Sequence, residues 1–186
     1  VGNYVFGFYM GDAGIGAFGI ACYYTPFVFM IGNAVAQSAQ PIVSFNYGSG
    51  DSRRVRSTLH VALLTAFACG LAVSGAFVLI PQQLVELFVN SNEAAFPLAV
   101  NGFPLIAVSF VFFIINLTCI GYFQSIERVR PAMVFALLRG LLLLVPSFIA
   151  LPLLLGENGI WLALALSEML TTLGIAGYSW WCCRHA

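Results

Sequence analysis

The feature that most constrains this chain is a run of 38 residues, 13 to 50, without a formal charge between Asp12 and Asp51. A helix of roughly 20 apolar residues suffices to cross the hydrocarbon core of a bilayer. A helix over residues 13–47 would be about 50 Å long, which exceeds the roughly 30 Å hydrocarbon layer, so it must tilt, bend or protrude. We expect the bends at Pro26 and Pro41, because each proline removes a backbone donor and crowds the preceding turn.

The composition supports a membrane protein and excludes several other classes. Of the 186 residues, 61% are hydrophobic and 8% are charged, whereas soluble domains carry about 25% charged residues. Lysine is absent and the formal net charge is zero, so the chain offers no basic surface for nucleic acid. None of the usual catalytic motifs occurs, and we expect neither an enzyme nor a cofactor. The five cysteines lack metal-ligand spacing, so we expect no metal site and interpret them as reduced, mostly packing residues: Cys22, Cys69, Cys119, Cys182 and Cys183.

Apolar runs separated by turns predict an all-α, polytopic transmembrane helix bundle of about five complete spans plus the end of a sixth, forming one unit over residues 1–186. The expected complete helices cover residues 13–47, 57–80, 94–125, 132–155 and 160–181. A short interfacial helix and loop are expected at 81–93. Residues 1–10 are about half the length of a span and precede a turn at 11–14, so we interpret the chain as a fragment that begins inside a helix.

The arginines indicate how the bundle is oriented. Six of the seven fall in loops 48–57 and 126–131 or in the C-terminal tail, which alternation places on one side: Arg53, Arg54, Arg56, Arg128, Arg130 and Arg184. The turns on the other side hold only acids: Asp12, Glu86, Glu93 and Glu157. The positive-inside rule then predicts that both loops and the C-terminus are cytoplasmic. Trp161 and Trp180 are 19 residues apart, or about 29 Å along a helix, a spacing typical of two aromatic interface belts.

A stripe of polar side chains runs along one face of the helix over residues 13–47. Its members are spaced i, i+4, i+7 and i+11: Asn33, Gln37, Gln40 and Ser44. Within a bilayer such a stripe faces protein or water and not lipid. Asn116 and Gln124 of the helix over residues 94–125 are expected to join it. The six residues either line a polar substrate cavity or act as interhelical contacts worth about 0.6 kcal/mol each.

Three further candidates lie inside predicted spans. Phe110, flanked by Phe103 and Phe113, offers an aromatic wall to a lipophilic cation, or simply packs against helices or lipid. Glu168 lies about 10 Å from the outer interface, where a carboxylate is either a coupling or gating group or a structural group bonded to a neighbouring helix. Arg139 lies about 12 Å into its helix, where it snorkels to the interface, pairs structurally or contacts substrate.

Four segments, in order, resemble the multidrug and toxic compound extrusion (MATE) transporters. Gln37 to Arg56 (QSAQPIVSFNYGSGDSRRVR) is similar to that family's eighth helix and the cytoplasmic loop after it. Gly121 to Ala132 (GYFQSIERVRPA), Leu138 to Leu155, and Asn158 to Thr172 (NGIWLALALSEMLTT) are similar to the tenth to twelfth helices. The resemblance extends over essentially the whole chain.

This resemblance implies a secondary transporter of two six-helix lobes in a bacterial-type inner membrane. Such an antiporter exports lipophilic cationic xenobiotics in exchange for H⁺ or Na⁺ by alternating access. The chain would be the second lobe with its first helix truncated, and its partners would be the bilayer, the missing N-terminal lobe and small organic cations. Relatives carry coupling carboxylates in the first lobe or in the seventh and tenth helices. Val1–Met10 and the residues between Glu93 and Glu127 hold none, so the ion stays unassigned. The alternatives are a lipid-linked sugar flippase and a non-transporting membrane scaffold or sensor subunit.

Overall fold

The computed structural model describes residues 2–185, and in that range it contains helices and turns but no strand. Five helical stretches are long and apolar enough to cross a membrane. The predicted all-α transmembrane class is therefore confirmed. The elements in order are α1 (Gly2–Gly48), α2 (Ser52–Leu79), α3 (Pro81–Glu86), α4 (Ala95–Ser125), α5 (Val129–Leu137), the π-helical segment η1 (Leu138–Leu142), α6 (Leu144–Leu155) and α7 (Glu157–His185).

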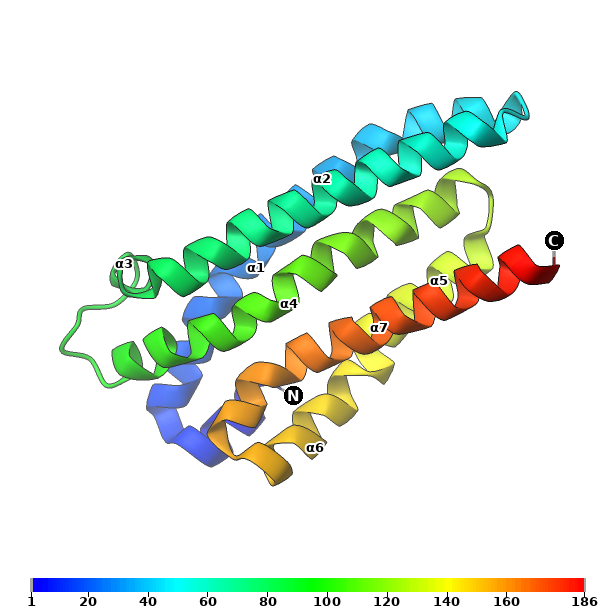
Figure 1. The fold of residues 1–186 in the computed structure, drawn as a ribbon. Helices are drawn as coiled ribbons and strands as arrows, with labels where there is room; N and C mark the ends of the chain where they lie inside the picture. The colour runs from blue at the N-terminus through cyan, green and yellow to red at the C-terminus, as the bar shows by residue number, and fades with distance from the viewer. Residues whose placement is uncertain (1, 186) are drawn as a thin grey trace.

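Helix α4 lies at the centre of the bundle, with α1 and α2 packed on one flank and α5 and α7 on the other (Figure 1). Glycines allow the close approach. A Cβ added to Gly70 of α2 would lie 2.8 Å from the Cα of Val111, and one added to Gly121 of α4 would lie 3.0 Å from the Cβ of Ala36. Helices in membranes associate through such small residues, because lipid leaves no hydrophobic drive between them.

The turn expected at residues 11–14 is a bend within α1. Gly11 has φ 65° and ψ −158°, a backbone region that is essentially restricted to glycine. The segment before the bend folds back on the segment after it, so that the rings of Phe6 and Phe18 stack with centroids 4.5 Å apart. The bend is drawn in dark blue at the lower left of Figure 1.

Three helices begin earlier than the sequence predicts. Helix α2 begins at Ser52 and not at residue 57, because the Asp51 carboxylate accepts a 3.0 Å hydrogen bond from the backbone N–H of Arg54 and caps the helix. Helix α5 begins at Val129, and α7 begins at Glu157 directly after Gly156, whose φ is 61°. The predicted loops 48–57 and 126–131 were therefore too long, and most of the arginines that they were expected to hold lie in the first turns of helices.

The predicted span over residues 132–155 is confirmed as a helical stretch, Val129–Leu155, but it is not a regular α-helix throughout. It is interrupted by η1, where the backbone N–H of Leu143 donates to the carbonyl of Leu138, five residues back, at 2.8 Å. Pro146 has no N–H to donate to Leu142 and would crowd that carbonyl in a regular α-helix. The wider turn is a local response to this proline, and such segments occur often at functional sites. It places Arg139 within an irregular stretch of backbone.

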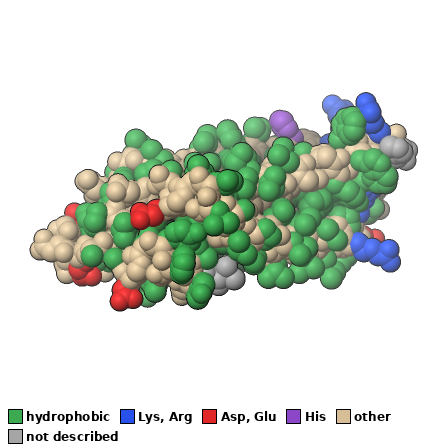
Figure 2. All heavy atoms as spheres, turned by 90° about the horizontal axis from the view of Figure 1, so that it is seen from below, with side chains coloured by type: hydrophobic (Ala, Val, Ile, Leu, Met, Phe, Trp, Pro, Cys, Tyr) green, Lys and Arg blue, Asp and Glu red, His purple; other side chains and the backbone are tan. Residues whose placement is uncertain are grey.

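The two ends of the bundle carry opposite charge. The α1–α2 turn, the α4–α5 turn and the C-terminus lie together at one end, and the Gly11 bend, the α2–α4 connection and the α6–α7 turn lie at the other (Figure 1). The arginines gather at the first end and most acids at the second (Figure 2). Trp180 is 58% exposed, but Trp161 is only 3% exposed and packs against the ring of Phe6 at 4.8 Å. The prediction that Trp161 forms an interface belt was therefore wrong.

Candidate functional site

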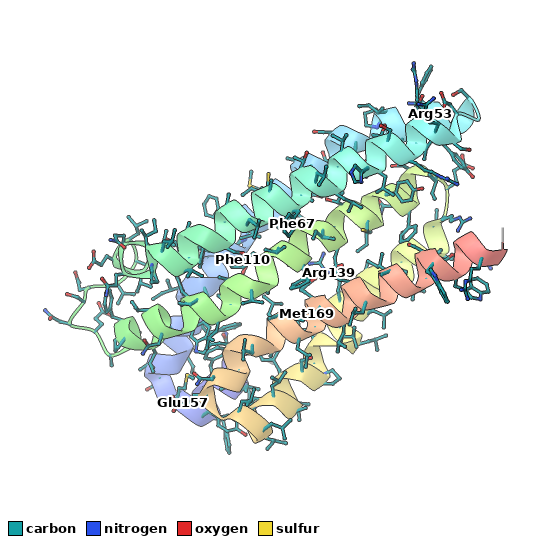
Figure 3. The ribbon with its side chains drawn as sticks, viewed as in Figure 1. Arg53, Phe67, Phe110, Arg139, Glu157 and Met169 are labelled. Atoms are coloured by element: carbon teal, nitrogen blue, oxygen red, sulfur yellow. The ribbon has the colours of Figure 1, made fainter. Side chains whose placement is uncertain are left out.

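A buried ion pair joins α7 to η1 in the middle of the bundle. The Oε1 atom of Glu168 accepts two hydrogen bonds from Arg139, one from Nη2 at 3.0 Å and one from Nε at 3.1 Å. The side chains of Arg139 and Glu168 are 11% and 2% exposed, respectively. Figure 3 places Arg139 between α4 and α7, far from both charged ends. The sequence marked both residues, and the structure shows that each is the other's partner.

Helix α4 supplies the other bonds to this pair. Nδ2 of Asn116 donates to Oε2 of Glu168 at 2.7 Å and to the Glu168 backbone carbonyl at 2.9 Å. Oδ1 of Asn116 accepts from the hydroxyl of Thr172, one turn beyond Glu168, at 2.9 Å. The guanidinium carbon of Arg139 lies 4.2 Å from the centre of the Phe113 ring, which attracts a cation through its face. The five residues form what we call the Glu168 network, which ties α4, η1 and α7 together.

The bonding of the Glu168 network limits what it can do chemically. Both carboxylate oxygens already accept hydrogen bonds, and among the described residues no buried side-chain polar atom lacks a partner. An added proton or sodium ion would therefore compete with Arg139 for the carboxylate. Across the described part of the chain, no group of histidine, cysteine and acidic residues is arranged to hold a metal ion.

The polar stripe on α1 lies beside α4. Nε2 of Gln40 donates to Oε1 of Gln124 over a long 3.5 Å, and the hydroxyl of Ser44 donates to the Ser125 carbonyl at 3.2 Å. Asn33 is half-buried and Gln37 is exposed. The half of the stripe nearer the arginine-bearing end thus contacts α4, and the other half extends away from those contacts.

Comparison with known proteins decides the family. The family model MatE matches residues 1–149, which is most of the chain. This chain belongs to the MATE family. No curated protein sequence matches it.

Solved structures show the same fold. A multidrug resistance MATE family transporter, solved in its outward-facing conformation, is 21% identical in sequence. Its TM-score is 0.86 over 98% of this chain and 41% of that one. A MOP superfamily transporter from Pyrococcus furiosus is 19% identical, with a TM-score of 0.86 and the same coverage. The reverse polarity of that protein's binding pocket suggests that its function differs. The MATE multidrug transporter DinF-BH, solved with a bound ligand, is 23% identical, with a TM-score of 0.77 over 94% of this chain and 39% of that one. The chain thus spans about two fifths of the length of these transporters.

Two of the predicted cavity residues lie in the interior of this MATE chain. Phe110 is 2% exposed and packs edge-on against Phe77 of α2, with centroids 4.9 Å apart, and Figure 3 shows it at the α2–α4 contact. Asn116 is fully buried in the Glu168 network. Both residues therefore contact neighbouring helices, Phe110 through its ring and Asn116 through hydrogen bonds.

The sequence analysis missed Thr172 and the pairing of Phe113 with Arg139. Thr172 follows Glu168 by four residues, so it lies on the same face of α7, and that spacing could have identified it. The contact between Phe113 and Arg139 joins two helices whose relative rotation the sequence does not specify. It also depends on η1, whose altered register moves Arg139 away from its position in a regular helix.

Proposed function

We propose that this chain is the second lobe of a secondary transporter that exports lipophilic cationic xenobiotics in exchange for H⁺ or Na⁺ by alternating access. The observation that carries the proposal is the MatE family match over residues 1–149. The 41% coverage of a solved multidrug transporter supports a further lobe elsewhere in the complete protein. Residues 1–186 then form one transmembrane unit, whose partners are the lipid bilayer, the other lobe and small organic cations.

The polar stripe supports a substrate path along α1. Gln37 is exposed and Asn33 half-buried, although both lie within the uncharged part of a membrane-length helix. An amide that faces hydrocarbon leaves its donors unsatisfied, so this side of α1 favours contact with water or the other lobe. Gln40, Gln124 and Ser44 extend the polar surface toward the arginine-bearing end. A cysteine replacement at Gln37 that reacts only with lipid-soluble reagents would contradict this role.

For Glu168 we propose a gating role in which a proton or sodium ion competes with Arg139. The carboxylate connects three elements, and one of them is the irregular segment η1, so its release would free α6 and α7 to shift relative to α4. Glu168→Gln should then abolish gradient-driven transport, while Glu157→Gln, at the charged outer end, should leave transport intact. Transport near the wild-type rate in Glu168→Gln would leave the carboxylate a purely structural role.

We also propose that the arginine-bearing end is cytoplasmic in a bacterial-type inner membrane. The clustering of arginines at one end supports this orientation through the positive-inside rule. Single cysteines at residues 54 and 128 should be labelled by a membrane-impermeant maleimide only from the cytoplasmic side. A cysteine at residue 93 should be labelled only from the opposite side. Labelling of residues 54 and 128 from different sides would overturn the topology.

Efflux of a cationic fluorescent dye from cells that express the complete gene product tests the transport function. We expect extrusion that requires a proton or sodium gradient and stops when that gradient is collapsed. Absence of efflux under either gradient would favour a scaffold or sensor subunit. Movement of lipid-linked sugar in place of dye would favour a flippase of the same architecture.

A further inference from the structure

Two adjoining hollows lie near the arginine-bearing end, between helices that all pack on α4 or flank it. The larger one has a volume of about 720 Å³ and lies between α2, α4 and α7. The smaller one, of about 290 Å³, adjoins the α1–α2 turn. The two hollows share four lining residues and therefore form a single groove. The shared residues are Arg56, Tyr122, Ile126 and Arg128. We call it the arginine groove.

The two arginines of the groove have no carboxylate partner among the described residues. The ion pairs of the described residues lie elsewhere and join Arg54 to Asp51 and Arg139 to Glu168. Nη1 of Arg128 donates instead to the sulfur of Cys182 at 3.2 Å, and sulfur is a weak acceptor. The groove therefore holds two positive charges that no carboxylate of the described residues neutralises.

Acids near the groove do not cancel this charge. Asp51 is engaged with Arg54, through both its ion pair and its helix cap. Glu127 is exposed on the α4–α5 turn, where it adopts a φ of 60°. It does not line either hollow. The charge that suits the groove is thus an anion, and a planar guanidinium matches the oxygens of phosphate in two-point contacts.

The rest of the lining is amphipathic. Leu59, Phe123 and Ile126 supply apolar surface, and Tyr178 and Ser179 of α7 supply hydroxyl groups beside the arginines. A free phosphate ion needs no apolar surface, but the first carbons of an acyl chain do. Basic pockets between transmembrane helices at the cytoplasmic interface are the sites that bind acidic lipid headgroups.

We propose that the arginine groove binds an anionic phospholipid, with its headgroup phosphate between Arg56 and Arg128 and its proximal acyl carbons against Leu59 and Phe123. The ligand has the opposite charge to the cationic substrates proposed above. All four of these contact residues line the larger hollow, between α2, α4 and α7, whereas the polar stripe lies where α1 meets α4. Lipid binding here would therefore hold the cytoplasmic ends of α2 and α7 to α4 without occupying the substrate path.

The complete gene product, reconstituted in phosphatidylcholine nanodiscs that contain a small fraction of phosphatidylglycerol, provides the test. Native mass spectrometry measures how much phosphatidylglycerol the protein retains. We expect Arg56→Gln/Arg128→Gln to bind it about 30-fold more weakly and Arg56→Gln alone about fivefold more weakly. The matched control is Arg53→Gln/Arg54→Gln, which removes the same charge from the same end outside the groove and should change retention little.

Two further arms test the arginine charge and the acyl contacts separately. Arg56→Lys/Arg128→Lys keeps the charge but loses the two-point contacts, so its affinity for the lipid should lie between those of the wild type and the glutamine pair. Inorganic phosphate at millimolar concentration should not displace the lipid, because phosphate lacks the acyl contacts. The proposal fails if the control loses as much lipid as the groove variant, if Arg56→Gln binds as the wild type does, or if phosphate displaces the lipid completely. Arg56 has no bond to another described side chain, so its single variant tests binding without disturbing the fold.

Discussion

The Glu168 network makes a quantitative prediction about stability, because it is an ion pair inside a membrane protein with all of its partners defined. The perturbations are Arg139→Met, Glu168→Met and the two combined. Methionine has about the length of glutamate and of the aliphatic stem of arginine and is apolar, so the double variant removes the charges and keeps part of the packing. Each single variant instead leaves one charge buried, since the arginine side chain is 11% exposed and the glutamate side chain 2%.

The expected magnitudes follow from this difference between the single variants, which leave a buried charge, and the double variant, which leaves none. Removing one partner of a buried pair costs about 3 to 5 kcal/mol, whereas replacing both by apolar residues is often close to neutral. Interhelical hydrogen bonds in membranes are weaker than in water-soluble cores, so we take the lower value, about 3 kcal/mol for each single variant. The double variant also loses the Asn116 bond and the Phe113 contact, together about 2 to 3 kcal/mol. The two mutations should therefore be non-additive by about 3 kcal/mol.

The measurement is the free energy of unfolding in mixed detergent micelles for the wild type, both single variants and the double variant. The exposed pair Asp51–Arg54, with side chains 43% and 74% exposed, serves as the control cycle. Its coupling should be below about 1 kcal/mol, because water screens such pairs. If the Arg139 and Glu168 variants are additive, or if each costs less than about 0.5 kcal/mol, the assignment of the network as a buried tie between helices is wrong.

Four further substitutions test packing, backbone geometry and helix capping. Gly102→Ala should destabilise the bundle by about 1 to 3 kcal/mol, because an added Cβ would overlap the indole of Trp161; Gly75→Ala, with no atom within 4 Å, should be neutral or stabilising. Gly11→Ala should cost about 1 to 3 kcal/mol although its surroundings are empty, because the cost lies in its backbone angles. Asp51→Ala should cost about 1 kcal/mol through loss of the α2 cap.

All four are measured as shifts in the free energy of unfolding in the same micelles. Equal effects of Gly102→Ala and Gly75→Ala would mean that Trp161 does not fill the notch at Gly102. A neutral Gly11→Ala would place the bend elsewhere. An Asp51→Asn variant keeps a capping oxygen and should recover most of the loss seen in Asp51→Ala.

The number and order of helices could be predicted from the sequence, because each span is an apolar run bounded by charge, glycine or proline. Their exact beginnings could not. The arginines after Asp51 suggested a loop, but arginine is a good helix former and the aspartate before it supplies a cap. Trp161 was expected at an interface from its spacing alone, although the notch left by Gly102 on α4 gives its ring a buried site.

The candidate site was predictable residue by residue but not as an arrangement. Glu168 and Arg139 were identifiable because charges inside apolar spans are rare. Their pairing depends on how α7 is rotated against η1, and the sequence pattern of neither helix specifies that rotation. The π-helical register at Leu138–Leu142 is a further local irregularity. Pro146 signalled a break in the helix, but it did not indicate which kind.

The central position of α4 has a consequence for how this protein is made. Ribosomes deliver α1 and α2 before α4, so both enter the membrane before their main packing surface has been synthesised. During that interval the amides along α1 and the bare backbone at Gly32 and Gly70 face acyl chains or the insertion machinery. Arrival of α4 covers Gly32 and Gly70 and gives Gln40 a partner in Gln124, and α7 later brings Glu168 to Asn116. Mutations on α4 should therefore reduce the yield of inserted protein more than equally severe ones on α7.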